Sequence, residues 1–360
     1  MIKMHKSFAS IVLVLLLATL ASAQVERIWL THRTNDPSKI VVNWTTKTPA
    51  DSKVRFGPTK DYGQEAHVPG SMTLHHVEIP LATKGEFHYS VKTGDQTSPD
   101  AVVNCYPTDV LRVAVVANWQ GKPNLQALLK DKINLLVTAG DNVPDLHSKC
   151  GIGTKNCTKP YEALIDTYPE MFRSIPFMPA LGNHDREIRQ RGPKPPTEPV
   201  YDIDATAFCK FFDLPGGKWK WHFDFPDFGV RFVVLDLNHI QDRGTTWQTC
   251  HDYGKDLVQF KWYGKLMTNR PSGFVVTLHN ERNASMRGQE KGAWHQMFYL
   301  NTSLGKGTKY ADPKVKFIEA EAGYCLLTFE KGKPTMTAEL KCLDGRVLDR
   351  TELSMRKERR

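Results

Sequence analysis

The C-terminal two thirds of the chain contain short apolar segments that each end abruptly in a polar residue. These segments, which have the length and composition of buried β-strands, are residues 111–117, 133–138, 175–181 and 273–278. The helices predicted around them cover residues 123–132, 160–174 and 253–268. Further strands are predicted over residues 219–225 and 230–237, and terminal hairpins over 324–353. Because strands that alternate with helices pair in parallel through right-handed crossovers, the sequence predicts an α/β domain over residues 107–360.

Four of the predicted strands end in side chains that could hold a metal ion. These side chains are Asn118, Asp141, Asn183 with His184, and His279. The carboxyl ends of strands in α/β sheets line the ligand crevice, so the four ends are expected to converge. One carboxylate with amide oxygens and imidazoles suits zinc, manganese or iron. Asp141 is the anionic member of the set and could bridge two ions.

Each of these residues also has an ordinary structural interpretation. The stretch over residues 182–185 could be an Asx turn. Asp141 could be a turn carboxylate after a strand, and His279 could be a satisfied histidine of the core. The agreement between several strand ends favours the metal site over these alternatives.

Residues 24–106 show a different pattern, with short alternating segments broken by turn residues. Strands are expected over residues 40–45, 53–57, 74–79 and 86–91. Strands at intervals of roughly 10 residues without a helical period predict a small β-sandwich. The histidines at positions 75, 76 and 88 could be imagined as a metal cluster, but strand-face histidines are more often structural. We expect this domain to support its neighbour and to carry no chemistry.

The N-terminus has the features of a secretory signal peptide over residues 1–23. Lys3 and Lys6 precede an apolar run over residues 11–20, and Ala21-Ser22-Ala23 forms a cleavage site. The alternative is a retained N-terminal anchor, but the run is too short to span a bilayer comfortably, and no later segment reaches the roughly 18 apolar residues that a span requires. The mature protein is therefore expected to be secreted or periplasmic.

Charge and cysteine content are compatible with an exported protein. The formal net charge is +9, which suits anionic substrates but is more simply explained by an ordinary solvated surface, and we find no nucleic-acid motif. Of the seven cysteines, Cys150 and Cys157 could close a small loop, and Cys325 with Cys342 could staple a terminal hairpin.

The motifs together resemble those of the purple acid phosphatases, within the calcineurin-like metallophosphoesterases. In that family a Gly-Asp after the second strand supplies the bridging carboxylate, as Gly140-Asp141 would here. Gly-Asn-His-Asp supplies an amide ligand and a catalytic histidine, matched by Asn183 and His184, and Val-x-x-His supplies a ligand matched by His279. The segments IVVNWTT, SKVRFG, LHHVEI and FHYSV resemble the family's N-terminal domain. The resemblance implies a fibronectin III-like β-sandwich followed by an αββα metallophosphoesterase domain.

Three departures show that the metal-ligand motifs are degenerate. Asn118 stands where the family has its first aspartate, Pro144 replaces the tyrosine ligand, and the closing Gly-His-x-His motif is absent. The candidates for replacement ligands are Glu319, Glu321, His239, His147 and Glu281.

The resemblance implies hydrolysis of phosphate monoesters by a metal-activated hydroxide, with one or two Fe, Zn or Mn ions. The substrate would be a phosphorylated small molecule or a phosphoprotein, and His184 would protonate the leaving oxygen. Because lost anionic ligands weaken divalent-ion affinity, the alternative is a pseudo-phosphatase that acts as an extracellular binding protein. A third possibility is an enzyme of altered chemistry that uses Glu319 or Glu321.

Overall fold

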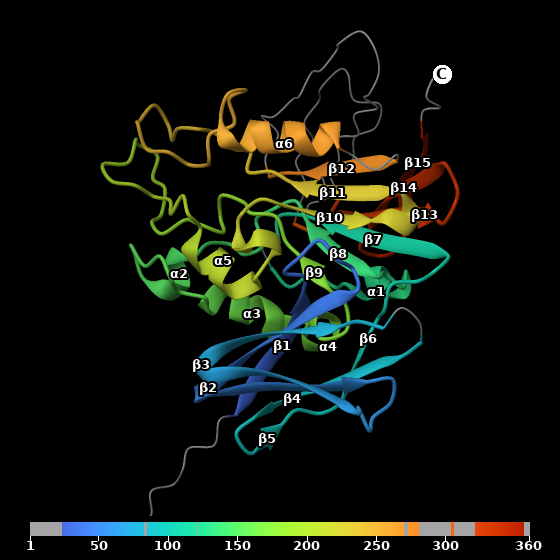
Figure 1. Cartoon of the computed structure of the whole chain (residues 1–360). Coiled ribbons are helices and arrows are strands. Elements are labelled where there is room, and N and C mark those ends of the chain that lie inside the picture. Colours follow the sequence, from blue (N-terminus) through green and yellow to red (C-terminus); the bar gives the residue numbers. More distant parts are fainter. Residues whose placement is uncertain are drawn as a thin grey trace, which may run out of the picture.

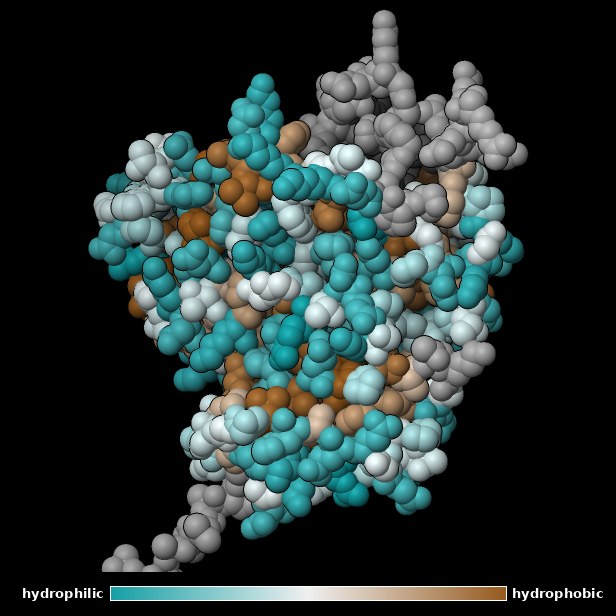
Figure 2. Space-filling model, viewed as in Figure 1, coloured by the Kyte–Doolittle hydropathy of each residue, from teal (hydrophilic) through white to brown (hydrophobic). Residues whose placement is uncertain are grey.

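The computed structural model describes residues 24–82, 85–119, 121–269, 273–280, 304–305 and 321–355. The predicted signal peptide therefore lies outside the described residues. Hydrophilic residues cover most of the face seen in Figure 2. Among the described residues, no helix combines the length and apolar character needed to cross a membrane.

The N-terminal part is an antiparallel β-sheet wrapped around its own apolar core. Its strands are β1 (Val25–Thr31), β2 (Lys39–Gly57), β3 (Gln64–Pro80), β4 (Phe87–Thr93), β5 (Gln96–Thr97) and β6 (Ala101–Val103). β2 joins two of the predicted strands in one long strand, whose first half pairs with β1 and whose last residues pair with β4. Trp44 and Tyr89 are fully buried in this core. The arrangement is compatible with the predicted sandwich, and its fibronectin-like character stays a prediction.

Histidines on the strands of this part form hydrogen bonds with other residues of the same sheet. His75 lies between the hydroxyls of Thr46 and Ser52, at 2.9 and 2.7 Å. His76 is 2.6 Å from the side-chain oxygen of Asn43. These hydrogen bonds are those of structural histidines.

Two mixed sheets form the second part of the molecule. The larger has the order β15-β14-β13-β7-β8-β9, and the smaller has the order β10-β11-β12. The larger contains β7 (Val110–Val116), β8 (Leu135–Thr138), β9 (Phe177–Met178), β13 (Gly323–Glu330), β14 (Thr335–Cys342) and β15 (Val347–Ser354). The smaller contains β10 (Trp221–Phe225), β11 (Val230–Val234) and β12 (Phe274–Leu278). β7, β8 and β9 are parallel, as predicted, and β11 is parallel to β12.

The two sheets pack face to face between layers of helices (Figure 1). The helices are α1 (Gln126–Lys130), α2 (His147–Cys150), α3 (Lys159–Thr167), α4 (Pro169–Phe172), α5 (Thr206–Phe212) and α6 (Val258–Thr268), with 3₁₀ turns at Pro215–Gly217 and Pro226–Phe228. Phe329 of β13 meets Phe232 and Phe274 of the smaller sheet at ring-centroid distances of 6.2 and 6.0 Å. α6 covers the outer face of β11 through a separate apolar cluster that includes Trp262 and Leu266.

The N-terminal sheet is fixed to the second part by aromatic and ionic contacts. Trp29 of β1 stacks on Phe211 of α5 at a ring-centroid distance of 4.1 Å. Arg27 of β1 bonds Asp166 of α3 at 2.9 Å. The N-terminal sheet thus supports the helices that lie beneath β7, β8 and β9.

Several predicted elements differ in extent from the structure. The helix predicted over residues 160–174 is two helices, α3 and α4, because Pro169 cannot continue the hydrogen bonding of α3. The strand predicted over residues 175–181 forms ladder pairs at Phe177–Met178 alone, and the following residues run into a loop.

The cysteines form one of the two suggested pairs. Cys150 and Cys157 are bridged, as expected, whereas Cys325 and Cys342 are free thiols. The suggestion of a disulfide between the latter two was wrong because of register. Cys325 lies opposite Leu340 and Cys342 lies opposite Gly323, so the two are not cross-strand partners.

Candidate active site at the strand ends

Asp141 lies at the centre of the predicted strand ends. It follows β8 through Gly140, and both residues have left-handed backbone conformations, with φ of 57° and 92°. Aspartate is one of the few residues with a side chain that tolerates this region. The backbone N–H of Asn118 donates to Gly140 O at 3.1 Å, and that of Trp119 donates to Asp141 O at 2.6 Å. The ends of β7 and β8 are therefore bound to each other directly.

The loop over residues 182–187 folds onto Asp141. The backbone N–H of His184 donates to Asp141 Oδ1 at 3.2 Å, and His184 Nε2 lies 4.0 Å from Asp141 Oδ2. Only glycine fits at position 182, because a Cβ there would lie 2.2 Å from Asp141 Oδ1. The predicted juxtaposition of Asp141 with the Asn183-His184 loop is thus present.

Asp185 fixes the shape of this loop. Its carboxylate accepts hydrogen bonds from the backbone N–H of Gly182 at 2.8 Å and from the side-chain amide of Asn142 at 2.9 Å. Asn142 also donates to Ala180 O at 2.8 Å. The sequence analysis did not assign a role to Asn142, although it directly follows the Gly140-Asp141 pair.

The end of β12 reaches the same place through Asn280. The side-chain amide of Asn280 donates to Ala139 O at 3.3 Å. A Cβ added to Gly140 would lie 2.7 Å from Asn280 Cβ and 3.0 Å from Gly182 Cα. His279, the predicted ligand of this strand end, is half-buried, and its Nδ1 lies 3.4 Å from Asn280 O. The end of β12 therefore contacts Gly140 through Asn280, the residue that follows the predicted ligand His279.

Charges around Asp141 shift the protonation of its neighbours. Burial, and then the nearby Asp141 carboxylate, raise the pKa of Asp185 to about 7. Burial opposes protonation of His184, but the carboxylates of Asp141 and Glu187 outweigh it and raise the pKa of the imidazole. Glu187 Oε2 lies 3.4 Å from His184 Nδ1, and Arg191 pairs with Glu187 at 2.9 Å.

Whether these residues could bind a metal ion depends on the donor atoms that their side chains offer. Among the described residues, no three His, Cys, Asp or Glu side chains are grouped so that they could hold an ion. Asn183 is 2 % exposed, and its Oδ1 is buried with no hydrogen-bond partner in the described part of the chain. A buried acceptor without a donor costs free energy, and a cation beside the Asp141 carboxylate would satisfy it. The oxygen atoms of Asp141 and Asn183 are therefore suitable donors for a cation. The histidine-rich ligand set of the purple acid phosphatases is not reproduced among the described residues.

The suggested replacement ligands that the structure describes do not join this group. Glu321 accepts a hydrogen bond from Arg346 at 2.7 Å and another from the Cys342 thiol at 2.9 Å. His147 lies 3.6 Å from Asp145, and His239 is exposed after β11. Glu281 and Glu319 lie outside the described residues.

A buried ionic cluster behind the loop was missed by the sequence analysis. Arg186 is fully buried, and its Nη1 donates to Asp236 Oδ2 at 2.8 Å. Asp236 follows β11 and also accepts hydrogen bonds from the backbone N–H and Nδ1 of His251, each at 2.8 Å. His251 in turn stacks on Trp219 at 3.6 Å. The acidic residue at the end of the apolar segment over residues 230–237 was the available sequence signal.

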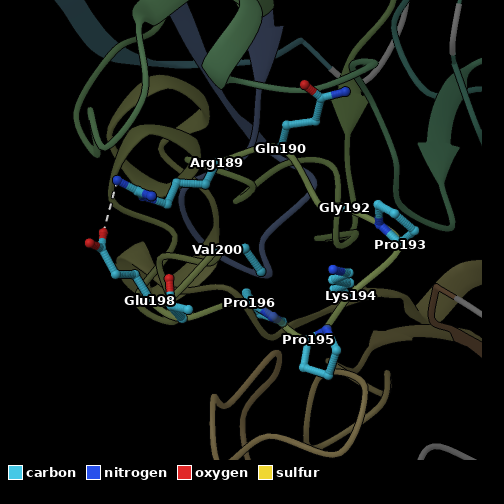
Figure 3. Close-up of a pocket in the computed structure, with 10 residues that line it drawn as sticks. Arg189, Gln190, Gly192, Pro193, Lys194, Pro195, Pro196, Glu198 and Val200 are labelled. Atoms are coloured by element: carbon cyan, nitrogen blue, oxygen red, sulfur yellow. Dashed lines mark ion pairs between the residues drawn. The ribbon is translucent and has the colours of Figure 1, made fainter.

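A separate hollow of about 420 Å³ lies within the loop between Glu187 and Tyr201 (Figure 3). The antiparallel bridge between Glu187 and Tyr201 closes the base of this loop, and Arg189 pairs with Glu198 across it at 2.8 Å. The lining consists of residues 189, 190, 192–198 and 200. None of the predicted site residues lines this hollow, so it is distinct from the strand-end site.

Solved structures share the fold. A purple acid phosphatase from yellow lupin (Lupinus luteus) seeds superposes with a TM-score of 0.64 at 15 % identity, covering 92 % of this chain and 74 % of that one. The structure of PhoD superposes with a TM-score of 0.57 at 12 % identity, covering 91 % of this chain and 88 % of that one. No family model matches the sequence, and no curated protein matches it. The protein therefore has a metallophosphoesterase-like fold.

Proposed function

We propose that the protein is an exported, metal-dependent phosphoesterase that hydrolyses phosphate monoesters of small molecules or phosphoproteins. The observation that carries the proposal is the set of contacts around Asp141. The end of β7 bonds its backbone, the 182–187 loop bonds its carboxylate, and Asn280 packs on the preceding Gly140. A phosphoesterase-like fold with its strand ends joined in this way supports a single reaction centre.

The metal site would consist of Asp141 and Asn183, with Asn118 and His279 as further donors from the neighbouring strand ends. A bound Fe, Zn or Mn ion, or a pair of ions, would supply an activated water and polarise the phosphoryl group. Asp141 contributes the negative charge that a cation requires. The Asn183 oxygen contributes a buried acceptor that has no partner among the described residues.

His184 is positioned to hold and deliver a proton. Its Nδ1 donates to the carbonyl of Pro144, which leaves Nε2 as the nitrogen that carries the exchangeable proton of the imidazolium. Burial opposes its protonation, but in the metal-free protein the carboxylates of Asp141 and Glu187 outweigh burial and raise its pKa. His184 would protonate the leaving oxygen of the phosphate ester.

Two features support export. The first residues have the pattern of a signal peptide, and Cys150 is bridged to Cys157. Disulfides form and persist mainly in oxidising compartments outside the cytosol. We infer that the mature protein begins near residue 24 and works in the periplasm or outside the cell.

Removal and return of metal tests the proposal. We expect the purified protein to hydrolyse a chromogenic phosphomonoester, to lose that activity after chelation, and to regain it with Zn²⁺, Mn²⁺ or iron. The physical reason is that Asp141 and the amide oxygens cannot stabilise phosphoryl charge without a cation. Metal content and turnover are measured on the same samples.

The binding-protein alternative is favoured by the asparagine at position 118 and the lack of a three-member ionisable cluster in the described residues. It predicts a different result in the same experiment. A protein that retains no metal at micromolar Zn²⁺, Mn²⁺ or iron, and shows no turnover before or after chelation, would establish the pseudo-phosphatase.

A further inference from the structure

Asn280, like Asn183, has a buried side-chain oxygen without a hydrogen-bond partner among the described residues. The residue is 5 % exposed, and the oxygen concerned is Oδ1. Its other amide atom, Nδ2, donates to Ala139 O at 3.3 Å, so the side chain is held in place by one end only. A buried amide oxygen that accepts nothing from the described residues is costly, which indicates that a cation or a further donor satisfies it.

The side chain of Asn280 lies next to Gly140, the residue before Asp141, at the strand-end site. Its Cβ and Nδ2 would lie 2.7 and 3.0 Å from a Cβ at Gly140, the residue before Asp141. The same Gly140 Cβ would lie 3.0 Å from Gly182 Cα, the residue before Asn183. The two glycines therefore let the loop that carries Asn183 and the side chain of Asn280 come close to the turn formed by Gly140 and Asp141.

We propose that Asn280 is a metal ligand, and that Asp141, Asn183 and Asn280 together bind a hard divalent cation of the Mn²⁺ or Mg²⁺ class. Carboxylate and amide oxygens are the donors that such cations prefer. One carboxylate and two amide oxygens are fewer ligands than these cations take, so the further donors Asn118 and His279, waters or substrate oxygens complete the shell. The inference rests on the proposed function, to which it adds a ligand and the class of metal.

The selection of a hard cation follows from the donors. Zinc and iron sites in proteins are usually built from thiolates and imidazoles with carboxylates. The oxygens of Asn183 and Asn280 are neutral and hard, and one ionised carboxylate accompanies them. A site of this kind is expected to bind Mn²⁺ with modest affinity and to exchange it with Mg²⁺.

Manganese titration of the full chain tests the proposal. Free Mn²⁺ is measured by its electron paramagnetic resonance signal, and thermal unfolding is followed with and without Mn²⁺. We expect the wild-type protein to bind Mn²⁺ and Asn280→Ala to raise its Kd at least about tenfold. Asn280→Asp keeps an oxygen donor and adds charge, so it is expected to bind at least as tightly as the wild type.

Asn238→Ala is the matched control. Asn238 is also a buried asparagine of this part of the chain, but its Oδ1 accepts a hydrogen bond from the backbone N–H of His239 at 2.7 Å. Its replacement is expected to leave the Kd for Mn²⁺ unchanged, which separates ligand loss from general loosening of the fold.

The outcomes distinguish the inference from the proposed function. A wild-type protein that binds Mn²⁺ and turns over, with Asn280→Ala and Asn280→Asp both binding like the wild type, overturns the role of Asn280 and leaves the phosphoesterase standing. A wild-type protein that binds no Mn²⁺ but turns over with another metal overturns the hard-cation class alone. A wild-type protein that binds no metal and shows no turnover overturns both.

Discussion

Asp141→Ala is expected to lower kcat/KM for a chromogenic phosphomonoester at least about a thousandfold, because a catalytic metal contributes several kcal/mol and each 1.36 kcal/mol is tenfold in rate. Asp141 supplies the negative charge of the site and accepts the hydrogen bond from His184 that holds the 182–187 loop. The measurement is steady-state turnover beside the metal content of the purified variant, which is expected to fall with the activity.

Asp227→Ala is the control for this prediction. Asp227 pairs with Lys331 on the surface, where both side chains are largely exposed. Exposed ion pairs contribute little, so turnover and metal content are expected to match the wild type. Equal turnover by Asp141→Ala and the wild type would show that the reaction centre, if any, lies elsewhere.

Arg186→Met is expected to lower the free energy of unfolding by about 3–5 kcal/mol, since it leaves the buried carboxylate of Asp236 without its cation. The side chains of Arg186 and Asp236 are 0 % and 1 % exposed. Urea unfolding at neutral pH measures the effect. Because Arg186 lies two residues after His184 in the same loop, turnover is expected to fall together with stability.

The matched control is Arg350→Met. Arg350 lies 3.5 Å from Glu339 but is 67 % exposed, so its loss is expected to change stability by less than about 1 kcal/mol. A loss for Arg186→Met no larger than for Arg350→Met would mean that the buried pair does not stabilise the fold.

The same pair predicts a loss of stability in acid. Burial alone would raise the pKa of Asp236, but Arg186 and His251 outweigh it and lower the pKa from 3.8 to about 2. The ionised carboxylate therefore stabilises the fold fully above its ordinary pKa, and this contribution disappears as pH falls through about 2. Between about pH 5 and pH 2, the wild type is expected to lose about 2 kcal/mol more than Asp236→Asn. Identical slopes of unfolding free energy against pH for the two proteins would contradict this assignment.

Local sequence patterns were sufficient to predict the strand ends that matter. Each apolar segment before Asn118, Asp141 and His279 is a strand in the structure. The parallel order of β7, β8 and β9 follows from the helices between them. These features depend on residues that are near one another in sequence.

The features that were missed depend on contacts between distant parts of the chain. The bond between Arg186 and Asp236 joins positions 50 residues apart, and the acidic residue in the segment over 230–237 does not by itself indicate its partner. Asn280 was passed over because the motif ends at His279, whereas packing against Gly140 is decided by the path of the chain after β12. The Cys325–Cys342 suggestion failed for a similar reason, because strand register is set by the whole hairpin.

The central claim is that the strand ends around Asp141 form one cation site. The most direct measurement is an anomalous difference map from a crystal of the full chain soaked in Mn²⁺. The claim predicts a peak within about 2.0–2.6 Å of oxygens of Asp141 and Asn183, the range of bonds from protein oxygens to such cations. A well-ordered crystal with manganese bound only at other places, or with no peak beside Asp141, would contradict it.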